Sequence, residues 1–237
     1  MTTARGSRRW TRRGALVLAA TALAGCAGGT GGLSGPPPTH SGPTVTYVAL
    51  GEQVPSTVTD PRLFWQLLFE KSALPYWATT FVVTVADDWE SDPAAVAGQV
   101  TALSPTVVSV DVGPEEALAG DGVAGFAASL DQLLDALDRA HVPTVLVADL
   151  PPAPQQSGTL PTAAEVAEYD SAIAADCKAA GAVLVDVHGI LARASSAGQA
   201  VSSASMLTAL GDKLVAAAFE AAVRNRSLSR PARGRPT

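Results

Sequence analysis

Five runs of β-branched and other apolar residues, separated by longer amphipathic stretches, constrain the fold of this chain more than any other feature. The runs are rich in Val and Leu with few polar interruptions, which is typical of strands covered on both faces. They span 44–50, 80–86, 106–112, 143–150 and 182–187. Strands of this kind are usually parallel, and strands that alternate with helices build a three-layer α/β sandwich.

The stretches between the apolar runs have helical periodicity. The clearest is 123–140, in which Phe126, Leu130 and Leu134 fall on one stripe. Further helices are expected near 61–73, 93–103, 162–180 and 207–224. The sequence therefore predicts a doubly wound α/β sandwich with a five-stranded parallel sheet, whose ligands bind at the carboxyl ends of the strands.

The first 25 residues have the parts of a bacterial lipoprotein signal peptide. They carry five Arg and no acid, and the apolar stretch 14–25 is too short to span a bilayer. It ends in Leu23-Ala24-Gly25-Cys26, which resembles a lipobox. We therefore expect acylation of Cys26 and anchoring at the outer face of the cell membrane. General secretory and twin-arginine export both stay open, and the alternative is an uncleaved apolar helix in a cytoplasmic protein.

Composition divides the rest of the chain into three parts. Residues 26–43 are a Gly/Pro-rich tether, 44–224 a single domain, and 225–237 a basic tail of the kind that is usually disordered. Between residues 26 and 220 there are 6 basic residues and 22 acidic ones, a formal charge of 6 − 22 = −16. Such a body repels nucleic acid, which excludes nucleic-acid binding as its function. If Cys26 is acylated, Cys177 has no partner and is expected to be a buried helix thiol.

The predicted strands place a group of polar side chains, most of them carboxylates and one of them an imidazole, along one edge of the sheet. Its members are Glu52, Gln53, Asp87, Asp88, Asp111, Glu115, Glu116, Asp149, Asp186 and His188. Neighbouring carboxylates can act as general acid and base on glycosides or bind Ca²⁺, but no loop has metal-ligand spacing. We therefore expect no metal and no cofactor. Trp77 and Trp89 could line a groove for sugars, whereas Trp65 has helical spacing and is expected in the core.

The order of motifs resembles that of the SGNH (GDSL-type) hydrolases, a family of flavodoxin-like esterases and lipases. The segment 47–53, Tyr-Val-Ala-Leu-Gly-Glu-Gln, resembles the strand that leads into the family's Gly-Asp-Ser. The segment 105–116 resembles the third strand with its Gly-x-Asn-Asp turn, and 145–152 resembles the fourth strand with its Pro-containing loop. The segments 169–187 and 210–216 resemble the last helix–strand unit and the closing helix.

The resemblance places different residue types at the catalytic positions of the family. The nucleophile position is Gln53 and the oxyanion-hole Asn position is Glu115, whose negative charge opposes the charge that develops there. The catalytic Asp and His fall at Ser203 and Met206. Loss of a triad nucleophile or base alone costs about 10⁴ to 10⁶ in rate. The resemblance therefore implies a pseudoenzyme that serves as a binding or assembly module of the cell envelope, with an envelope polymer or a protein as partner.

Two alternatives stay open. One is an active envelope hydrolase, acting on acyl or glycosyl groups, whose site is rebuilt from other residues. Asp186 and His188 are its rescue candidates, although a His at a strand end is more often structural. The other is a surface lipoprotein that uses its basic tail, with binding that falls steeply as salt rises.

Overall fold

The computed structural model describes residues 44–51, 65–73, 78–83, 89, 92–111, 122–152, 162–195, 200 and 207–229. Its strands are β1 (Thr44–Gly51), β2 (Ala78–Val83), β3 (Val107–Asp111), β4 (Thr144–Ala148) and β5 (Val183–Val185). They form one sheet of order β2-β1-β3-β4-β5, and every neighbouring pair is parallel. The predicted fold class, an α/β sandwich with a five-stranded parallel sheet, is confirmed.

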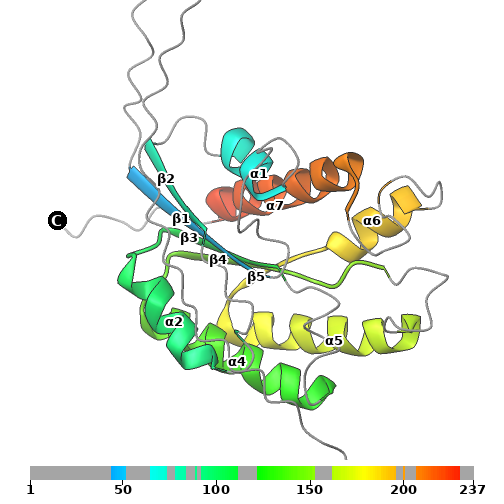
Figure 1. Ribbon diagram of the computed structural model, residues 1–237, viewed down its shortest axis with the longest axis horizontal. Coiled ribbons are helices and arrows are strands. Elements are labelled where there is room, and N and C mark those ends of the chain that lie inside the picture. Colours follow the sequence, from blue (N-terminus) through cyan, green and yellow to red (C-terminus); the bar gives the residue numbers. More distant parts are fainter. Residues whose placement is uncertain are drawn as a thin grey trace, which may run out of the picture.

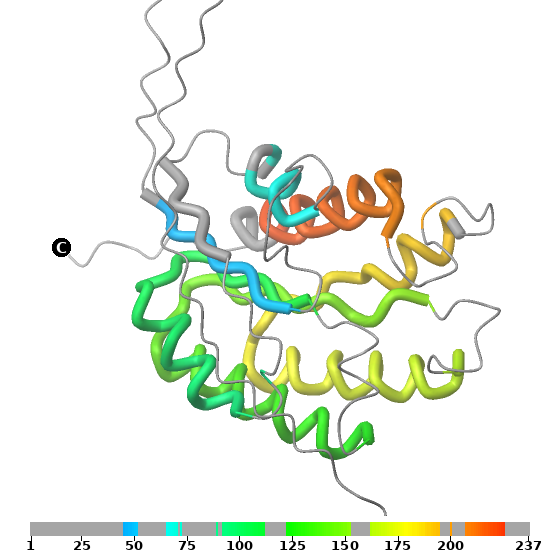
Figure 2. The backbone as a smooth tube through the Cα atoms, in the orientation of Figure 1, coloured from blue at the N-terminus to red at the C-terminus, as the bar shows by residue number. Residues whose placement is uncertain are grey.

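Helices cover both faces of this sheet (Figures 1 and 2). They are α1 (Trp65–Ala73), α2 (Pro93–Ala102), α4 (Val123–Arg139), α5 (Ala163–Ala180), α6 (Val187–Ser195) and α7 (Ala209–Ser229). Helices α1, α6 and α7 lie on one face, and α2, α4 and α5 lie on the other. Side chains of β1 alternate between the two cores: Tyr47 and Ala49 join the first layer, Val48 and Leu50 the second.

Aromatic side chains fill the centre of each core. On the α1/α7 face the ring of Trp65 stacks on Phe219, with centroids 4.2 Å apart, as expected for a core Trp65. On the other face Trp89 is fully buried and meets Phe126 edge to face at 5.9 Å. The expectation that Trp89 lines a groove for sugars is therefore wrong, because its ring is enclosed by the core. Trp77 lies outside the described residues.

The structure differs from the sequence prediction at two places. The predicted strand 182–187 ends at Val185, because Val187 begins α6, a helix that the apolar pattern did not predict. The last helix continues past 224 to Ser229, so the first part of the expected disordered tail is helical. No helix in the described part of the chain combines the length and apolarity needed to cross a membrane.

The end of β1 requires a glycine. Gly51 has φ +133° and pairs with Asp111 of β3. A Cβ at this position would overlap the backbone oxygen of Asp111, so the two strand ends approach each other only because position 51 has no side chain. This approach sets the register of β3 against β1.

We expect Gly51→Ala to lower the free energy of unfolding by at least about 2 kcal/mol, through backbone strain and overlap with Asp111. The matched control is Gly98→Ala on the exposed side of α2, where an added Cβ meets no atom within 4 Å. That change should be neutral or stabilising by up to about 1 kcal/mol, because Ala favours a helix. Urea unfolding of both variants measures the difference, and equal stability would contradict the strain at Gly51.

Candidate functional site

The strand order locates the expected site. The chain passes from β1 to β2 on one side of β1 and then crosses back to β3 on its other side, so the direction of strand order reverses between β1 and β3. In open parallel sheets ligands bind at such a switch point, outside the carboxyl ends of the strands. The described residues at this point are Gly51 and Asp111, which are paired across the two strands.

The carboxylate of Asp111 is held by the first residue of α1. The indole N–H of Trp65 donates to Asp111 Oδ2 at 3.1 Å. Surrounding protein atoms desolvate the carboxyl group and raise its pKa to about 6, although the indole hydrogen bond acts in the opposite direction. Asp111 is therefore anchored to the helix that covers it.

A second carboxyl group, that of Asp212 in the first turn of α7, lies beside the backbone of Trp65. Asp212 is only 7% exposed, and its carboxylate accepts a hydrogen bond from the backbone N–H of Trp65. Burial raises the pKa of Asp212 to about 6, and the charge of Asp111 raises it further. We call Asp111, Trp65 and Asp212 the Trp65 cluster. It joins β3, α1 and α7 beside the switch point.

The serine on β3 near this cluster is not available for chemistry. Ser109 is fully buried, and its Oγ lies 2.8 Å from the hydroxyl oxygen of Tyr47. Burial raises the pKa of Tyr47 far above its ordinary value, so the phenol stays neutral. The pair satisfies two buried hydroxyl groups in the core and has no access to a substrate.

A second polar group, formed by Asp149, Asp170 and His188, lies over the ends of β4 and β5. The N–H of Leu150 donates to Asp170 Oδ1 at 2.8 Å, and the N–H of His188 donates to Asp149 Oδ1 at 2.7 Å. His188 Nδ1 lies 3.0 Å from Asp170 Oδ2. The ring N–H is not aligned as in a hydrogen bond, so the contact is an ion pair when His188 is protonated. We call these three residues the His188 cluster.

Burial dominates the electrostatics of the His188 cluster. It raises the pKa of Asp149 to about 6, against the backbone hydrogen bond from His188. Burial also raises the pKa of Asp170, although the Leu150 N–H and the imidazole stabilise its charged form. Each carboxylate accepts a backbone N–H from a loop or helix start, which is a structural use of the charge.

The predicted rescue pair Asp186 and His188 does not form a dyad. Asp186 precedes α6 and accepts the N–H of Gly189 at 2.7 Å, and its other oxygen lies 3.7 Å from Arg193. It therefore caps the helix and is turned toward Arg193, while His188 pairs with Asp170. The interpretation of Asp186 as the partner of His188 is wrong, because the strand ends at Val185 and the alternation of side chains ends with it.

Most predicted site residues lie outside the described part of the chain. These are Cys26, Glu52, Gln53, Asp87, Asp88, Glu115, Glu116, Ser203 and Met206. Their positions remain sequence predictions. Within the described ranges no group of three or more His, Cys, Asp or Glu side chains is arranged to hold a metal ion.

Asp170 and Asp212 were not among the predicted site residues, although each occupies a sequence position that indicates a buried polar contact. Asp170 lies on the buried stripe of α5 with Val166, Ile173 and Cys177. Asp212 lies in the same way on the stripe of α7 that continues through buried residues such as Phe219. A carboxylate at an apolar stripe position must find a partner when the helix packs, so such a position predicts a buried polar contact. Cys177 is buried as predicted.

Comparison with known proteins shows the fold alone. No protein-family model and no curated protein matches the chain. An alpha/beta hydrolase enzyme from the metagenome of Lake Arreo, Spain, has a TM-score of 0.63 and 16% identity, covering 78% of this chain and 97% of its own. An acetylxylan esterase from Geobacillus stearothermophilus has a TM-score of 0.60 and 12% identity, covering 79% and 95%. The acetyl xylan esterase AlAXEase has a TM-score of 0.61 and 14% identity, covering 76% and 100%. The chain thus has the fold of these hydrolases.

We expect Asp212→Asn to reduce the loss of stability between pH 4 and pH 7 by about 1–2 kcal/mol. With its pKa raised to about 6, folded Asp212 binds a proton more tightly than in the unfolded chain. Its contribution is therefore complete below about pH 4 and is lost as the pH rises through about 6. Asn keeps an acceptor for the Trp65 N–H and does not ionise.

Urea unfolding at several pH values measures the effect. The control is Lys213→Gln, at the neighbouring exposed position of α7. A wild-type pH profile for the Asp212 variant would show that this carboxyl group is not desolvated in the folded protein.

Proposed function

We propose that this chain is a cell-envelope lipoprotein whose SGNH-hydrolase-like domain binds a partner and does not hydrolyse esters. The fold of acetylxylan esterases supports the hydrolase-like scaffold. The family assignment rests on the order of sequence motifs, and loss of chemistry rests on Gln53, Glu115, Ser203 and Met206 at the catalytic positions. The basic start, the short apolar run and Cys26 support the lipid anchor.

One structural observation supports the proposed loss of chemistry. The imidazole of His188, at the carboxyl edge, faces Asp170, and no serine hydroxyl binds it within the described residues. The neighbouring carboxylates hold backbone N–H groups of Leu150 and His188. Nucleophilic catalysis on an ester needs a base within hydrogen-bond reach of a nucleophile. Here the imidazole faces Asp170, whose carboxylate also holds the N–H of Leu150 in the loop after β4.

A second candidate, an active hydrolase with a rebuilt site, is favoured by one feature of the same cluster. The side chains of His188 and Asp170 are 35% and 21% exposed and 3.0 Å apart, which is the contact of a base with its orienting carboxylate. A water molecule activated by the free ring nitrogen could then attack an ester. This mechanism needs no serine and depends wholly on His188.

We expect the purified chain from residue 26 to 237 to show no turnover of p-nitrophenyl acetate above the His188→Ala variant, and no labelling by a fluorophosphonate probe. The reason is that no nucleophile is paired with a base among the residues that the structure describes. Gln53→Ser should remain equally inactive, because no base or oxyanion hole is supplied for the new hydroxyl.

Each alternative has its own signature in this assay. Turnover that disappears in His188→Ala would establish the rebuilt active site. Fluorophosphonate labelling of the wild-type chain, or esterase activity in Gln53→Ser, would show that the catalytic positions are misassigned and would end the pseudoenzyme proposal.

The anchor is tested independently. In bacterial cells supplied with radiolabelled palmitate, the wild-type chain should incorporate label and sediment with membranes, whereas Cys26→Ala should do neither. Cys177→Ala is the matched control, since that thiol is buried and should not influence labelling. Incorporation of palmitate into the Cys26→Ala variant would refute acylation at this residue.

A further inference from the structure

The first residue of helix α1 is bound by two carboxyl groups that come from different elements. The indole N–H of Trp65 donates to Asp111 Oδ2 at 3.1 Å, at the end of β3. The backbone N–H of Trp65 donates to Asp212, in the first turn of α7. Two acidic groups thus converge on one residue of a helix that is only 9 residues long.

No cation balances these two carboxyl groups within the described residues. Neither Asp111 nor Asp212 forms an ion pair there, and each is desolvated by burial. The titratable groups nearest to Asp111 are also acidic, Tyr47 on β1 and Glu70 on α1. Lys213, beside Asp212 in the chain, is exposed. When both carboxyl groups are ionised, two like charges are therefore held in a desolvated site without compensation.

The second residue of α1 disfavours the packed position of the helix independently. Gln66 is 1% exposed, and in the described part of the chain neither its amide nitrogen nor its amide oxygen has a hydrogen-bond partner. An amide that is buried without partners is unfavourable, because it has lost its hydrogen bonds to water. Outward movement of α1 returns Gln66 to water, so this side chain favours opening.

Aromatic contacts keep the packed position dominant. The ring of Trp65 stacks on Phe219 at 4.2 Å, and Phe69 meets the rings of Phe219 and Tyr47 at 5.8 Å and 5.3 Å. These contacts are apolar and do not change with pH. The open form is therefore a minor population, and the two carboxyl groups decide how that population changes with pH.

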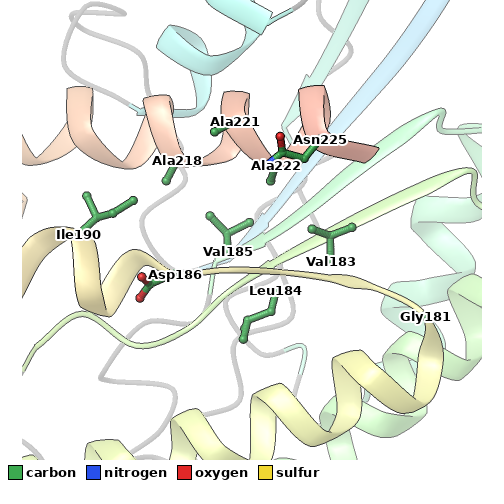
Figure 3. A pocket seen from close by; sticks show the side chains of 10 residues that line it. All are labelled: Gly181, Val183, Leu184, Val185, Asp186, Ile190, Ala218, Ala221, Ala222 and Asn225. Atoms are coloured by element: carbon green, nitrogen blue, oxygen red, sulfur yellow. The ribbon is translucent and has the colours of Figure 1, made fainter. Parts of the chain in front are cut away.

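Helix α7 is attached to the sheet by contacts that carry no charge. Figure 3 shows Ala218 and Ala222 facing Val185 of β5 at an apolar pocket between the helix and the strand. The charged residues farther along the helix, Glu220 and Arg224, pair with each other. Ionisation of Asp111 and Asp212 therefore weakens the attachment of α1 and leaves these contacts of α7 unchanged.

From this geometry we propose that α1 is a pH-sensitive lid over the β1/β3 switch point. Protons on Asp111 and Asp212 hold the lid closed, and loss of these protons makes it open more often. Opening releases Trp65 from the end of β3, where ligands of such sheets bind. Control of a partner by the lid rests on the proposed function, whereas the movement of the lid does not.

The direction of the pH dependence follows from the burial of the two groups. Burial raises the pKa of Asp111 and of Asp212 to about 6 in the closed form. Opening hydrates both groups and returns each pKa toward its ordinary value near 4. The closed form thus binds protons more tightly. Its advantage is complete below about pH 4 and is lost as the pH rises through about 6.

Hydrogen exchange of the chain from residue 26 to 237, followed by mass spectrometry, measures the opening of α1. Each exchange rate is divided by the intrinsic rate at the same pH, which leaves the change in opening. We expect protection of Trp65–Ala73 to fall at least tenfold between about pH 5 and about pH 7.5, relative to protection of α4. Each carboxyl group alone can change the opening constant by up to about 100-fold.

Variants separate the two carboxyl groups from the buried amide. The double variant Asp111→Asn/Asp212→Asn should lose the fall in protection of α1, because Asn does not ionise and keeps an acceptor oxygen for Trp65. The matched control Glu168→Gln, which removes an exposed carboxyl group of α5, should retain it. Gln66→Leu should raise protection of α1 about fivefold or more at both pH values without changing its pH dependence.

Equal changes in the protection of α1 and α4 would show that pH acts only on global unfolding and would overturn the proposal. A fall in α1 protection that persists in the double variant would assign the effect to other groups and overturn it as well. If the double variant does not fold, the comparison of α1 with α4 in the wild-type chain still decides. None of these outcomes depends on ester turnover or palmitate incorporation, which test the proposed function separately.

Discussion

The close approach of the ends of β1 and β3 is the constraint on which the rest of the structure depends. The backbone oxygen of Asp111 occupies the space that a side chain at Gly51 would need, so the register Gly51–Asp111 exists only with glycine there. That register brings the Asp111 carboxylate to the indole of Trp65. Trp65 in turn stacks on Phe219 and donates to Asp212. The first and last helices are thereby positioned by one strand pair.

Two carboxylates at this edge of the sheet hold backbone N–H groups in place. Asp149 holds the start of α6 through the N–H of His188, and Asp170 holds Leu150 in the loop after β4. Burial raises the pKa of each carboxyl group, so the hydrogen bonds from the backbone only partly offset the cost of burying its charge. The arrangement is therefore consistent with a fold that keeps its scaffold and uses its polar groups to fix loops.

The sequence predicted the sheet because burial on both faces is a local property of composition. Val and Leu runs such as that of β3 indicate a covered parallel strand whatever its neighbours are. The end of β5 and the start of α6 were not predicted, because Val187 suits either a strand or a helix. Only the packing of α6 against α7 selects the helix. The contacts of His188 with Asp170 and of Trp65 with Asp212 were not predicted for another reason. Asp170 and Asp212 lie far from them in the chain, and strand order and register, which no local pattern encodes, bring them together.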